Sequence, residues 1–521
     1  MTASTRDRGE LAIVLHSHMP YVEGFGTWPF GEEWLFEAMA TSYLPLIELF
    51  RRWAGEGRER AVTVGVTPVL ADQLALAEVG ERFTAFMRGV RAEAHRLDID
   101  GLERAGQVEA AAALRASARR YERATESFDE IGRDVLAELR RLQDAGILEL
   151  WTSAATHAVL PLLATDVGVR LQVRTGISAQ WGRLGPWTGG FWLPECAFRP
   201  GLEDELSSAG VRAFCVDQTE HGDDLDQLQP IATSGPAAIP IDWRTISLVW
   251  NDQGYPADGV YRDYHAPTTN GLRPYANAGG AYEVEAAGAR AREHARDFVE
   301  RVISRLERFR ADRGRPGLLV CALDTELLGH WWHEGPVWLD AVVSEADAAG
   351  LALATLPDAI ERHPPVERTL EQSSWGSPKD FTTWDSPRVA EFAWTARSAE
   401  LALVGALSHG VEPGAEGRRR GSPAVNPAAW RAARELLAIQ SSDWAFMETR
   451  ELAGDYPRRR LRGHRAAFDQ ALRDFERSMK DSAVMSDRDR AALRGLAPTL
   501  ELSTLLEPTA TRGREPDLVA H

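Results

Sequence analysis

The chain has 521 residues and carries 77 acidic against 59 basic side chains, which gives a formal net charge of -18. This length suffices for one large domain with its own core and a second domain beside it. The acidic balance disfavours nucleic acid and anionic membranes as partners, because both are bound by basic surfaces. No apolar stretch reaches the roughly 18 residues that a membrane-spanning helix needs. We therefore expect neither nucleic acid nor a membrane as partner.

Cysteine and tryptophan usage narrows the class of protein further. The three cysteines, Cys196, Cys215 and Cys321, are too few and too scattered for a disulfide framework. Because the N-terminal segment also lacks a signal-peptide core, we expect a reduced, cytoplasmic protein. There are 17 tryptophans against 9 tyrosines, and many lie beside turns and polar clusters. Indole rings stack on the apolar faces of sugars, so this excess indicates carbohydrate binding.

Short apolar runs recur through the first two thirds of the chain, and helix-like stretches lie between most of them. The runs are apolar on both faces, as buried parallel strands are. Seven or eight strands that alternate with helices predict an α/β protein built as a barrel. The predicted strands span residues 11–15, 62–66, 147–150, 190–193, 211–216, 246–250, 317–323 and 351–356.

Two regions break this alternation. Residues 75–145 are rich in Ala, Arg and Glu with apolar residues at helical spacing, which predicts an insert of two or more surface helices. Beyond Arg388 the strand-like runs stop and helical segments dominate, the last of them near 487–506. Asn426 followed by Pro427 marks a helix start there. We predict a barrel domain over 1–365 and a mainly helical domain over 366–521.

Polar side chains follow five of the predicted strands at the point where each strand ends. His16 and His18 come after the first run, His157 after the third, Glu195 after the fourth, Asp217 after the fifth and Asp324 after the seventh. In barrels the catalytic groups project from the C-terminal ends of the strands. We therefore expect these side chains to meet at one end of the barrel.

A metal site is one interpretation of the histidines. His16 and His18, two positions apart, and His330 and His333, three apart, have the spacing of ligand pairs. The chain has neither an H-E-x-x-H nor a C-x-x-C motif, however, and no glycine-rich phosphate loop follows a strand. Cys196 is a possible nucleophile, but nothing in the sequence pairs it with a base.

The remaining interpretation is a pair of carboxylates, Glu195 and Asp324. Each ends a hydrophobic strand and has tryptophans near it in sequence. A retaining glycosidase needs one ionised carboxylate as nucleophile and a second, kept protonated, as acid and then base. Residue types alone do not assign these two roles.

Five blocks of sequence are specific enough to compare with known families. They read LHSHMPYV, ELWTSAATHAVLPLL, GFWLPECAFRPGLE, ALDTELLGHWWHEGPVWL, and the pair SSWGSPKDFTTW and LLAIQSSDWAF. In order and spacing they resemble glycoside hydrolase family 57, and within it the 1,4-α-glucan branching enzymes with a helical C-terminal domain. The resemblance implies an incomplete, seven-stranded (β/α) barrel with inserted helices and a C-terminal helical domain.

The resemblance also implies roles for individual residues. Glu195 matches the nucleophile and Asp324 the acid/base of the family. The partner would be an α-1,4-glucan such as glycogen or amylose, and neither a cofactor nor a metal is implied. Beside Asp324, we include His330 and Trp332 as cleft residues. The other residues implied in substrate binding are His16, His18, His157, Trp250, Trp375, Trp384 and Asp443.

The implied reaction cuts an α-1,4-glucan, holds the piece on Glu195, and passes it to a 6-hydroxyl of another chain. Two alternatives use the same family chemistry, namely α-amylase and 4-α-glucanotransferase activity. A third alternative is a glucan-binding protein without catalysis, which the presence of both carboxylates disfavours. The sequence leaves the oligomeric state open.

Three positions depart from the pattern of the branching enzymes. The segment 217–241 is short and contains no tyrosine, whereas these enzymes carry a long loop there with a tyrosine at its tip. His221 or Gln218 is a candidate for the place of that tyrosine. Ile241 replaces an arginine, for which Arg244 is a candidate substitute, and Ala257 replaces a glycine. These positions concern acceptor binding and water exclusion, so the ratio of transfer to hydrolysis stays open.

Overall fold

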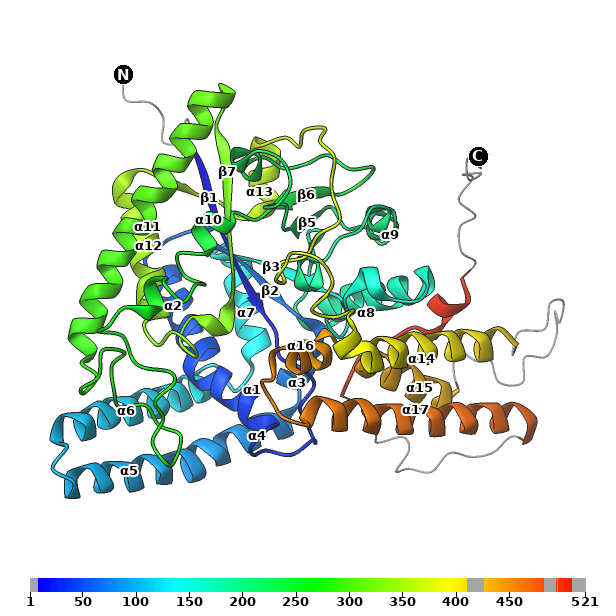
Figure 1. Cartoon of the computed structure of the whole chain (residues 1–521), viewed down its shortest axis with the longest axis horizontal. Coiled ribbons are helices and arrows are strands. Elements are labelled where there is room, and N and C mark those ends of the chain that lie inside the picture. Colours follow the sequence, from blue (N-terminus) through cyan, green and yellow to red (C-terminus); the bar gives the residue numbers. More distant parts are fainter. Residues whose placement is uncertain (1–7, 410–425, 482–492, 494, 508–521) are drawn as a thin grey trace.

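The computed structural model describes residues 8–409, 426–481, 493 and 495–507. At its centre lies a parallel sheet in the order β6-β5-β4-β3-β2-β1-β7, with helices packed around it (Figure 1). This architecture confirms the predicted incomplete seven-stranded barrel. The strands are β1 (Gly9–Ser17), β2 (Val62–Val66), β3 (Leu148–Ser153), β4 (Gly190–Trp192), β5 (Ala213–Val216), β6 (Ala237–Pro240), β7 (Gly317–Asp324) and β8 (Ala352–Leu353).

The two longest strands, β1 and β7, are neighbours in the sheet and set the position of the site. β1 is buried along its whole length and pairs in parallel with β7, so that His16 lies opposite Asp324. The short strand β8 pairs with Glu10 and Leu11 at the start of β1. The two outer strands of the sheet approach each other, because the Asp242 amide after β6 donates to the carbonyl of Val320 in β7 at 2.8 Å. The C-terminal ends of the strands are thereby gathered on one side.

The strand predicted at 246–250 was wrong. That segment follows a helical turn, α10 (Trp243–Ile246), whose first residue is capped by Asp242 through its side chain and the amide of Thr245. A short apolar run has the same appearance in a buried strand and in a buried helical turn, so periodicity alone does not separate them. The Asp242 side chain, which favours a helical turn here by capping α10, is itself held by an ion pair with Arg305.

The sixth strand was missed because β6 has an unusual composition. It reads Ala-Ala-Ile-Pro, and both alanine and proline are depleted in strands. Proline is tolerated at this place because β6 is an outer strand of the sheet and needs no second ladder partner.

The helical insert projects from one side of the barrel (Figure 1). A π-helical turn (Met87–Arg91) joins its first two helices, and its last helix, α7, leads directly into β3. The insert consists of α4 (Ala77–Phe86), α5 (Ala92–Arg104), α6 (Val108–Glu130) and α7 (Val135–Asp144).

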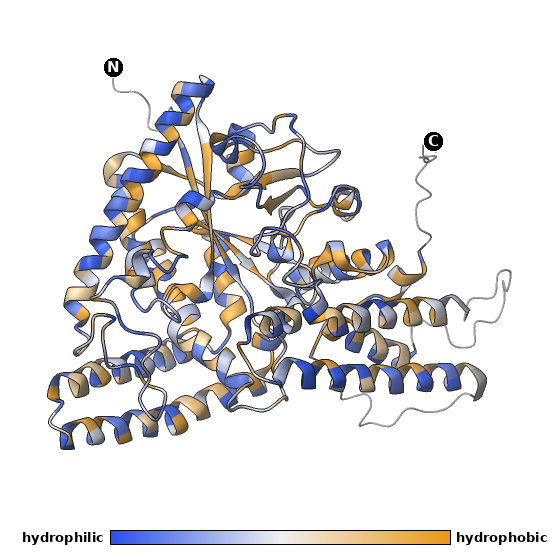
Figure 2. Cartoon of the chain, viewed as in Figure 1, coloured by the Kyte–Doolittle hydropathy of each residue, from blue (hydrophilic) through white to orange (hydrophobic). Residues whose placement is uncertain are grey.

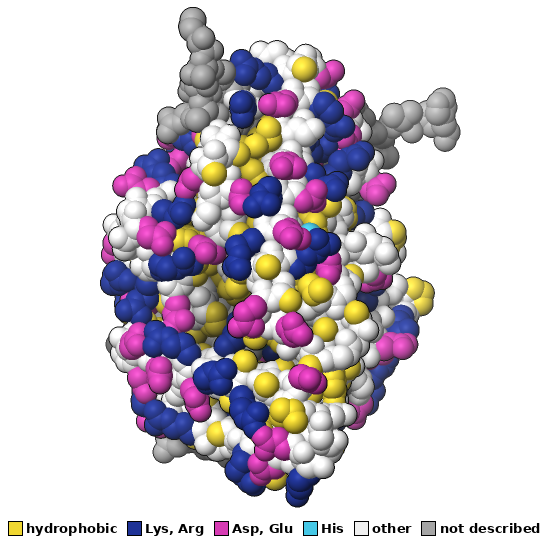
Figure 3. Space-filling view, turned by 90° about the vertical axis from the view of Figure 1, so that its left-hand side faces the viewer, with side chains coloured by type: hydrophobic (Ala, Val, Ile, Leu, Met, Phe, Trp, Pro, Cys, Tyr) yellow, Lys and Arg dark blue, Asp and Glu magenta, His cyan; other side chains and the backbone are white. Residues whose placement is uncertain are grey.

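Further helices cover the barrel. The longest, α11 (Val284–Arg313), alternates hydrophilic and hydrophobic residues, as expected for a helix with one buried face (Figure 2). On the molecular face that includes the left-hand side of Figure 1, basic and acidic side chains are intermixed (Figure 3). No described helix is long and apolar enough to cross a bilayer. The covering helices are α1 (Glu32–Ala38), α2 (Leu44–Gly55), α3 (Pro68–Leu74), α8 (Asp166–Arg183), α9 (Leu202–Ser208), α11 (Val284–Arg313), α12 (Gly335–Ala349) and α13 (Leu356–Arg362).

The C-terminal region is helical. Its helices are α14 (Ala390–His409), α15 (Pro427–Ile439), α16 (Ser442–Arg450) and α17 (Tyr456–Asp481). Asn426 caps α15, since its side chain accepts from the amide of Ala428 at 2.9 Å. The helix predicted near 487–506 lies partly outside the described residues, and its last part forms a 3-10 turn (Leu502–Leu506). The domain boundary between 365 and 366 stays a prediction.

Candidate active site

Glu195 lies in a tight turn (Pro194–Cys196) that directly follows β4. Its φ of 62° falls in the left-handed region, which costs a non-glycine residue about 1 kcal/mol or more. Strain of this kind persists where the surrounding structure fixes a side chain in one direction. The Glu195 side chain is 12% exposed, so it remains within reach of a ligand.

Three groups surround the Glu195 carboxylate. The indole Nε1 of Trp375 donates to its Oε2 at 2.8 Å, and the Trp375 amide donates to the Glu195 carbonyl at 2.8 Å. His157 Nδ1 lies 3.7 Å from Oε1. Burial raises the pKa of Glu195, and hydrogen bonds from Trp375 and Ser442 oppose that rise. These donors favour the ionised carboxylate, which is the form a nucleophile needs.

His16 and His157 form a neutral pair. Their Nε2 atoms are 3.0 Å apart, and His157 Nδ1 lies 2.9 Å from the Ser442 hydroxyl. Burial lowers the pKa of both imidazoles well below the ordinary value. Nδ1 of His16 has no hydrogen-bond partner among the described residues, so the tautomer with a proton on Nε2 leaves no N–H unpaired. In this arrangement His16 donates to His157, and His157 donates to Ser442.

His18 differs from the other two histidines. Its Nε2 lies 3.0 Å from Oδ1 of Asp443, and its Nδ1 lies 3.1 Å from the hydroxyl of Thr67. Burial lowers the pKa of His18, but the carboxylates of Asp443, Glu326 and Glu195 together outweigh burial and raise the pKa of the imidazole above its ordinary value. The same contact offsets burial at Asp443 and lowers the pKa of that carboxyl. The ring of His18 stacks on His157 with 4.0 Å between centroids, which brings one positive charge into the cluster.

Asp324 is the last residue of β7 and is half-buried. Burial raises the pKa of its carboxyl well above the ordinary value, and the nearby carboxylates of Glu326 and Glu195 raise it further. Glu195 therefore has hydrogen-bond donors that favour its charged form, whereas Asp324 has acidic neighbours that favour its protonated form. This difference in surroundings makes Glu195 the better nucleophile and Asp324 the better acid.

Glu326 connects the site to the surrounding barrel through two hydrogen bonds. Its Oε1 accepts hydrogen bonds from the hydroxyl of Tyr43 and, at 3.1 Å, from the amide of His18. Burial raises its pKa to about 7. These contacts make Glu326 a structural partner within the barrel.

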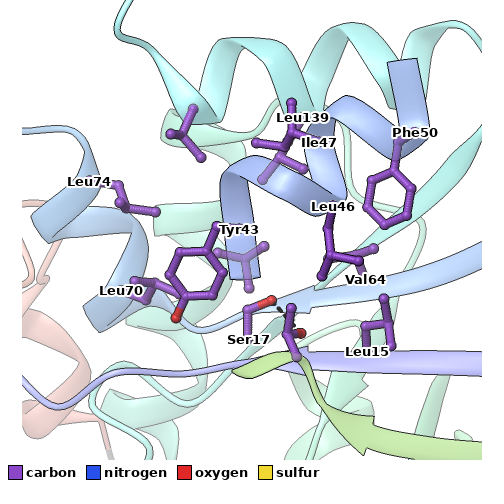
Figure 4. A pocket seen from close by; sticks show the side chains of 13 residues that line it. Leu15, Ser17, Tyr43, Leu46, Ile47, Phe50, Val64, Leu70, Leu74 and Leu139 are labelled. Carbon is purple, nitrogen blue, oxygen red and sulfur yellow. Dashed lines mark hydrogen bonds between the residues drawn. The ribbon is translucent and has the colours of Figure 1, made fainter. Parts of the chain in front are cut away.

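A small cavity lies beside β1, among residues other than the candidate catalytic ones (Figure 4). Leu15 and Ser17 line it, and the Ser17 hydroxyl bonds that of Thr325 at 2.8 Å in its wall. Because alternate residues of a strand point to opposite faces, the cavity is on the other side of β1 from His16. Its remaining walls are apolar apart from Tyr43, so it does not suit a sugar.

The adjacent tryptophans after β7 face different ways. Trp332 is 1% exposed and packs against Trp338 at 5.4 Å and Tyr261 at 5.6 Å between centroids. Trp331 is 38% exposed and meets the half-exposed Trp250 edge to face at 5.6 Å. The substrate-binding role predicted for Trp332 therefore does not suit its place in the core, and it is the ring of Trp331 that lies exposed beside Trp250.

Removing the Trp332 side chain is expected to destabilise the protein by about 3–5 kcal/mol, because Trp332→Ala leaves a large cavity in the core. The matched variant Trp331→Ala should change stability by less than about 0.5 kcal/mol, since that ring is on the surface. Urea unfolding of both variants measures the difference. Equal losses of stability would show that the two rings are not placed as described.

Two further predicted site residues are His330, which lies beside Trp331, and Trp384, which packs against the loop 374–379 that carries Trp375 (the Trp375 loop). His330 is half-buried, with Nδ1 3.2 Å from the hydroxyl of Thr41, and burial lowers its pKa to about 4. It is therefore a neutral group next to Trp331. Trp384 is 3% exposed and packs so closely on Gly376 that a Cβ there would lie 2.9 Å from its ring. Trp384 thus supports the loop and presents no open ring face.

The candidate substitutes for the missing loop residues lie elsewhere. Arg244 is exposed and pairs with Asp224. Gln218 is buried and donates to the carbonyl of Glu371 and the hydroxyl of Ser373, both at 2.9 Å. Gln218 is thus packed within the fold and does not take the place of a tyrosine at a loop tip.

Within the described ranges, no group of three or more His, Cys, Asp or Glu side chains is arranged to hold a metal ion. His330 and His333 do not act as a pair, since His333 contacts Arg120 instead.

Sequence reasoning did not single out Ser442 or Trp192. Ser442 lies next to Asp443 in the chain and contacts His157, and Trp192 stacks on His16 at 4.6 Å between centroids. The only signal for either residue was its place within a sequence block already noted.

A parallel barrel with two unequal carboxylates, a histidine cluster and indole rings at one end defines an enzyme that acts on carbohydrate. The sequence pattern of glycosyl hydrolase family 57 matches residues 12–370, and that of the C-terminal region of 1,4-alpha-glucan branching enzymes matches residues 416–492. The chain belongs to glycosyl hydrolase family 57.

Individual relatives agree with this assignment. A 1,4-alpha-glucan branching enzyme of Thermococcus kodakarensis is 32% identical over 91% of this chain and 74% of its own length. The crystal structure of a branching enzyme of this family from Pyrococcus horikoshii superposes with a TM-score of 0.88 at 30% identity, covering 96% of this chain and 98% of that one. An α-amylase from Thermotoga maritima shares the fold, with a TM-score of 0.82 at 23% identity over 96% of this chain and 100% of its own.

Proposed function

We propose that the protein is a retaining 1,4-α-glucan branching enzyme that uses Glu195 as nucleophile and Asp324 as acid and base. The observation that carries the assignment of roles is the contrast between the two carboxylates. Glu195 accepts the Trp375 indole N–H, whereas Asp324 ends β7 among other acids. The named relatives over most of the chain support an α-1,4-glucan as the substrate.

In the first step, Glu195 attacks the anomeric carbon of an α-1,4-linked glucose unit. Asp324 gives its proton to the departing 4-oxygen, so one chain leaves as an alcohol and the other stays as an ester on Glu195. The charged His18–Asp443 pair and the neutral His16–His157 pair offer fixed polar groups around this centre, which favours a charged transition state.

In the second step, Asp324 takes the proton of a 6-hydroxyl on an acceptor chain, and that oxygen displaces Glu195 from the anomeric carbon. The product is an α-1,6 branch, and both carboxyl groups return to their starting forms. Transfer requires the acceptor to outcompete water, which depends on rings that hold the sugar chain. The exposed pair Trp250 and Trp331 offers such a surface.

Incubation with amylose tests this function. We expect α-1,6 linkages to appear by proton NMR and iodine staining to fall, with few new reducing ends. Reducing ends without α-1,6 linkages would instead establish hydrolysis, which the short segment 217–241 makes the second candidate. Bound amylose with no change in linkages or ends would contradict both.

We propose a cytoplasmic location for this reaction. The three cysteines are free and buried, which suits a reducing compartment.

A further inference from the structure

Lys379 stands out by its residue type. Of the 59 lysine and arginine residues in the chain, only two are lysines, Lys379 and Lys480. Arginine is thus the ordinary basic residue of this protein. A lysine inside the loop that follows Trp375 marks a position where a compact ammonium group differs in effect from a broad, planar guanidinium.

The Lys379 ammonium occupies a site that fits a compact charge. Its Nζ donates to Oδ2 of Asp217 at 2.7 Å and lies 3.3 Å from the centre of the Trp243 ring. Asp217 directly follows β5, is 1% exposed, and accepts from the amide of Thr219 through its other oxygen. The Lys379 side chain is itself only 15% exposed, so this ion pair is far better shielded than a surface pair.

The same side chain also fixes the loop that carries Trp375. Lys379 Nζ donates to the Trp375 carbonyl at 3.4 Å, and the Lys379 amide donates to the Gly376 carbonyl at 2.6 Å. The Lys379 carbonyl accepts from the Ser374 amide at 3.0 Å. These bonds close the loop on itself, with Lys379 held at a φ of 76°. Trp375, between them, makes two hydrogen bonds to Glu195.

We propose that Lys379 is a positioning residue whose ion pair with Asp217 anchors the Trp375 loop to the barrel and holds the indole N–H on Glu195. A continuous set of contacts leads from β5 through Asp217 and Lys379 to Trp375 and the nucleophile. The inference rests on the proposed function, because it assigns Lys379 to the site that cleaves glucan. Lys379 and Asp217 are 15% and 1% exposed, so the effect of this pair on the reaction is assigned to the placement of Trp375.

The test compares Lys379→Met, which keeps the length and removes the charge, with Lys480→Met in α17 as the matched control. Initial rates of amylose cleavage are measured across pH for both. We expect Lys379→Met to lower kcat by about 10- to 100-fold and to leave KM within about 2-fold. Loss of the indole donor favours the protonated form of Glu195, so the acid limb of kcat should move up by about half a pH unit or more. Lys480→Met should match the parent enzyme.

A double variant separates positioning from a general structural role. Trp375→Phe removes the indole N–H, so adding Lys379→Met to it should move the acid limb no further. An additional shift in the double variant, or an unchanged acid limb in Lys379→Met, would overturn the proposal. Asp217→Asn, nearly isosteric, should reproduce the effect of Lys379→Met and serves if the latter folds poorly.

Crystal structures of the parent enzyme and of Lys379→Met test the role of Lys379 independently of any activity, because they show directly whether Trp375 Nε1 still contacts the Glu195 carboxylate. If the parent enzyme acts on no glucan, the proposed function fails, while the position of the Trp375 ring still answers the question about Lys379. We expect the distance from Nε1 to the Glu195 carboxylate to exceed hydrogen-bond range in the variant. A ring that remains bonded to Glu195 without Lys379 would refute its positioning role.

Discussion

Replacing Glu195 by glutamine is expected to lower kcat on amylose by at least about 10⁴-fold, because an amide cannot form the glycosyl ester. The side chain keeps its size, and the Trp375 indole can still donate to the amide oxygen. We therefore expect the thermal midpoint to stay within a few degrees of the parent enzyme. The measurement is the initial rate of loss of iodine staining, together with a calorimetric scan.

The control for this result is Cys196→Ala, which changes the next residue in the same turn. Cys196 is buried, and burial raises the pKa of its thiol well above the ordinary value, so it is not a reactive thiolate. We expect Cys196→Ala to retain most of the activity. A Glu195→Gln enzyme that branches amylose at the parent rate would rule out Glu195 as the nucleophile.

Replacing Asp324 by asparagine is expected to lower kcat on amylose by about 10²–10⁴-fold, because the leaving sugar then receives no proton. With α-maltosyl fluoride as donor, the first step should remain fast, since fluoride leaves without a proton. The measurement compares fluoride release with amylose cleavage in the same variant. Equal losses with both donors would contradict a role as acid.

The pH dependence should change with the same substitution. Asp324 acts while protonated, and its raised pKa keeps it protonated to higher pH, so activity is lost as pH rises through that pKa. The alkaline limb of kcat/KM should therefore disappear in Asp324→Asn. The acid limb, which follows ionisation of Glu195, should remain. An alkaline limb that survives unchanged would point to another acid.

The positions of the two carboxylates follow from sequence because buried parallel strands end where polar residues begin. Glu195 and Asp324 each come directly after an apolar run, and the structure places both at the C-terminal ends of their strands. Their separate roles do not follow in the same way. The indole N–H on Glu195 and the acids around Asp324 come from segments that meet only in the folded chain.

The differences from prediction have the same origin. Ala237–Pro240 forms a strand against its composition because an outer position needs no second partner. Which of Trp331 and Trp332 is exposed depends on how Trp332 packs against Trp338 and Tyr261, and the contact with Tyr261 forms only in the folded chain. The Lys379–Asp217 pair joins two loops separated by more than a hundred residues, and no local spacing predicts it.

Trapping the covalent intermediate tests the central claim most directly. Asp324→Asn is incubated briefly with α-maltosyl fluoride, quenched in acid, digested with pepsin and examined by tandem mass spectrometry. Without its base, the variant should accumulate the glycosyl ester, and we predict one maltosyl unit on the Glu195 carboxylate within the peptide that contains Trp-Leu-Pro-Glu-Cys. A sugar attached to any other residue would contradict the assignment of Glu195 as the nucleophile. Release of fluoride with inversion at the anomeric carbon and no labelled peptide would contradict a retaining mechanism.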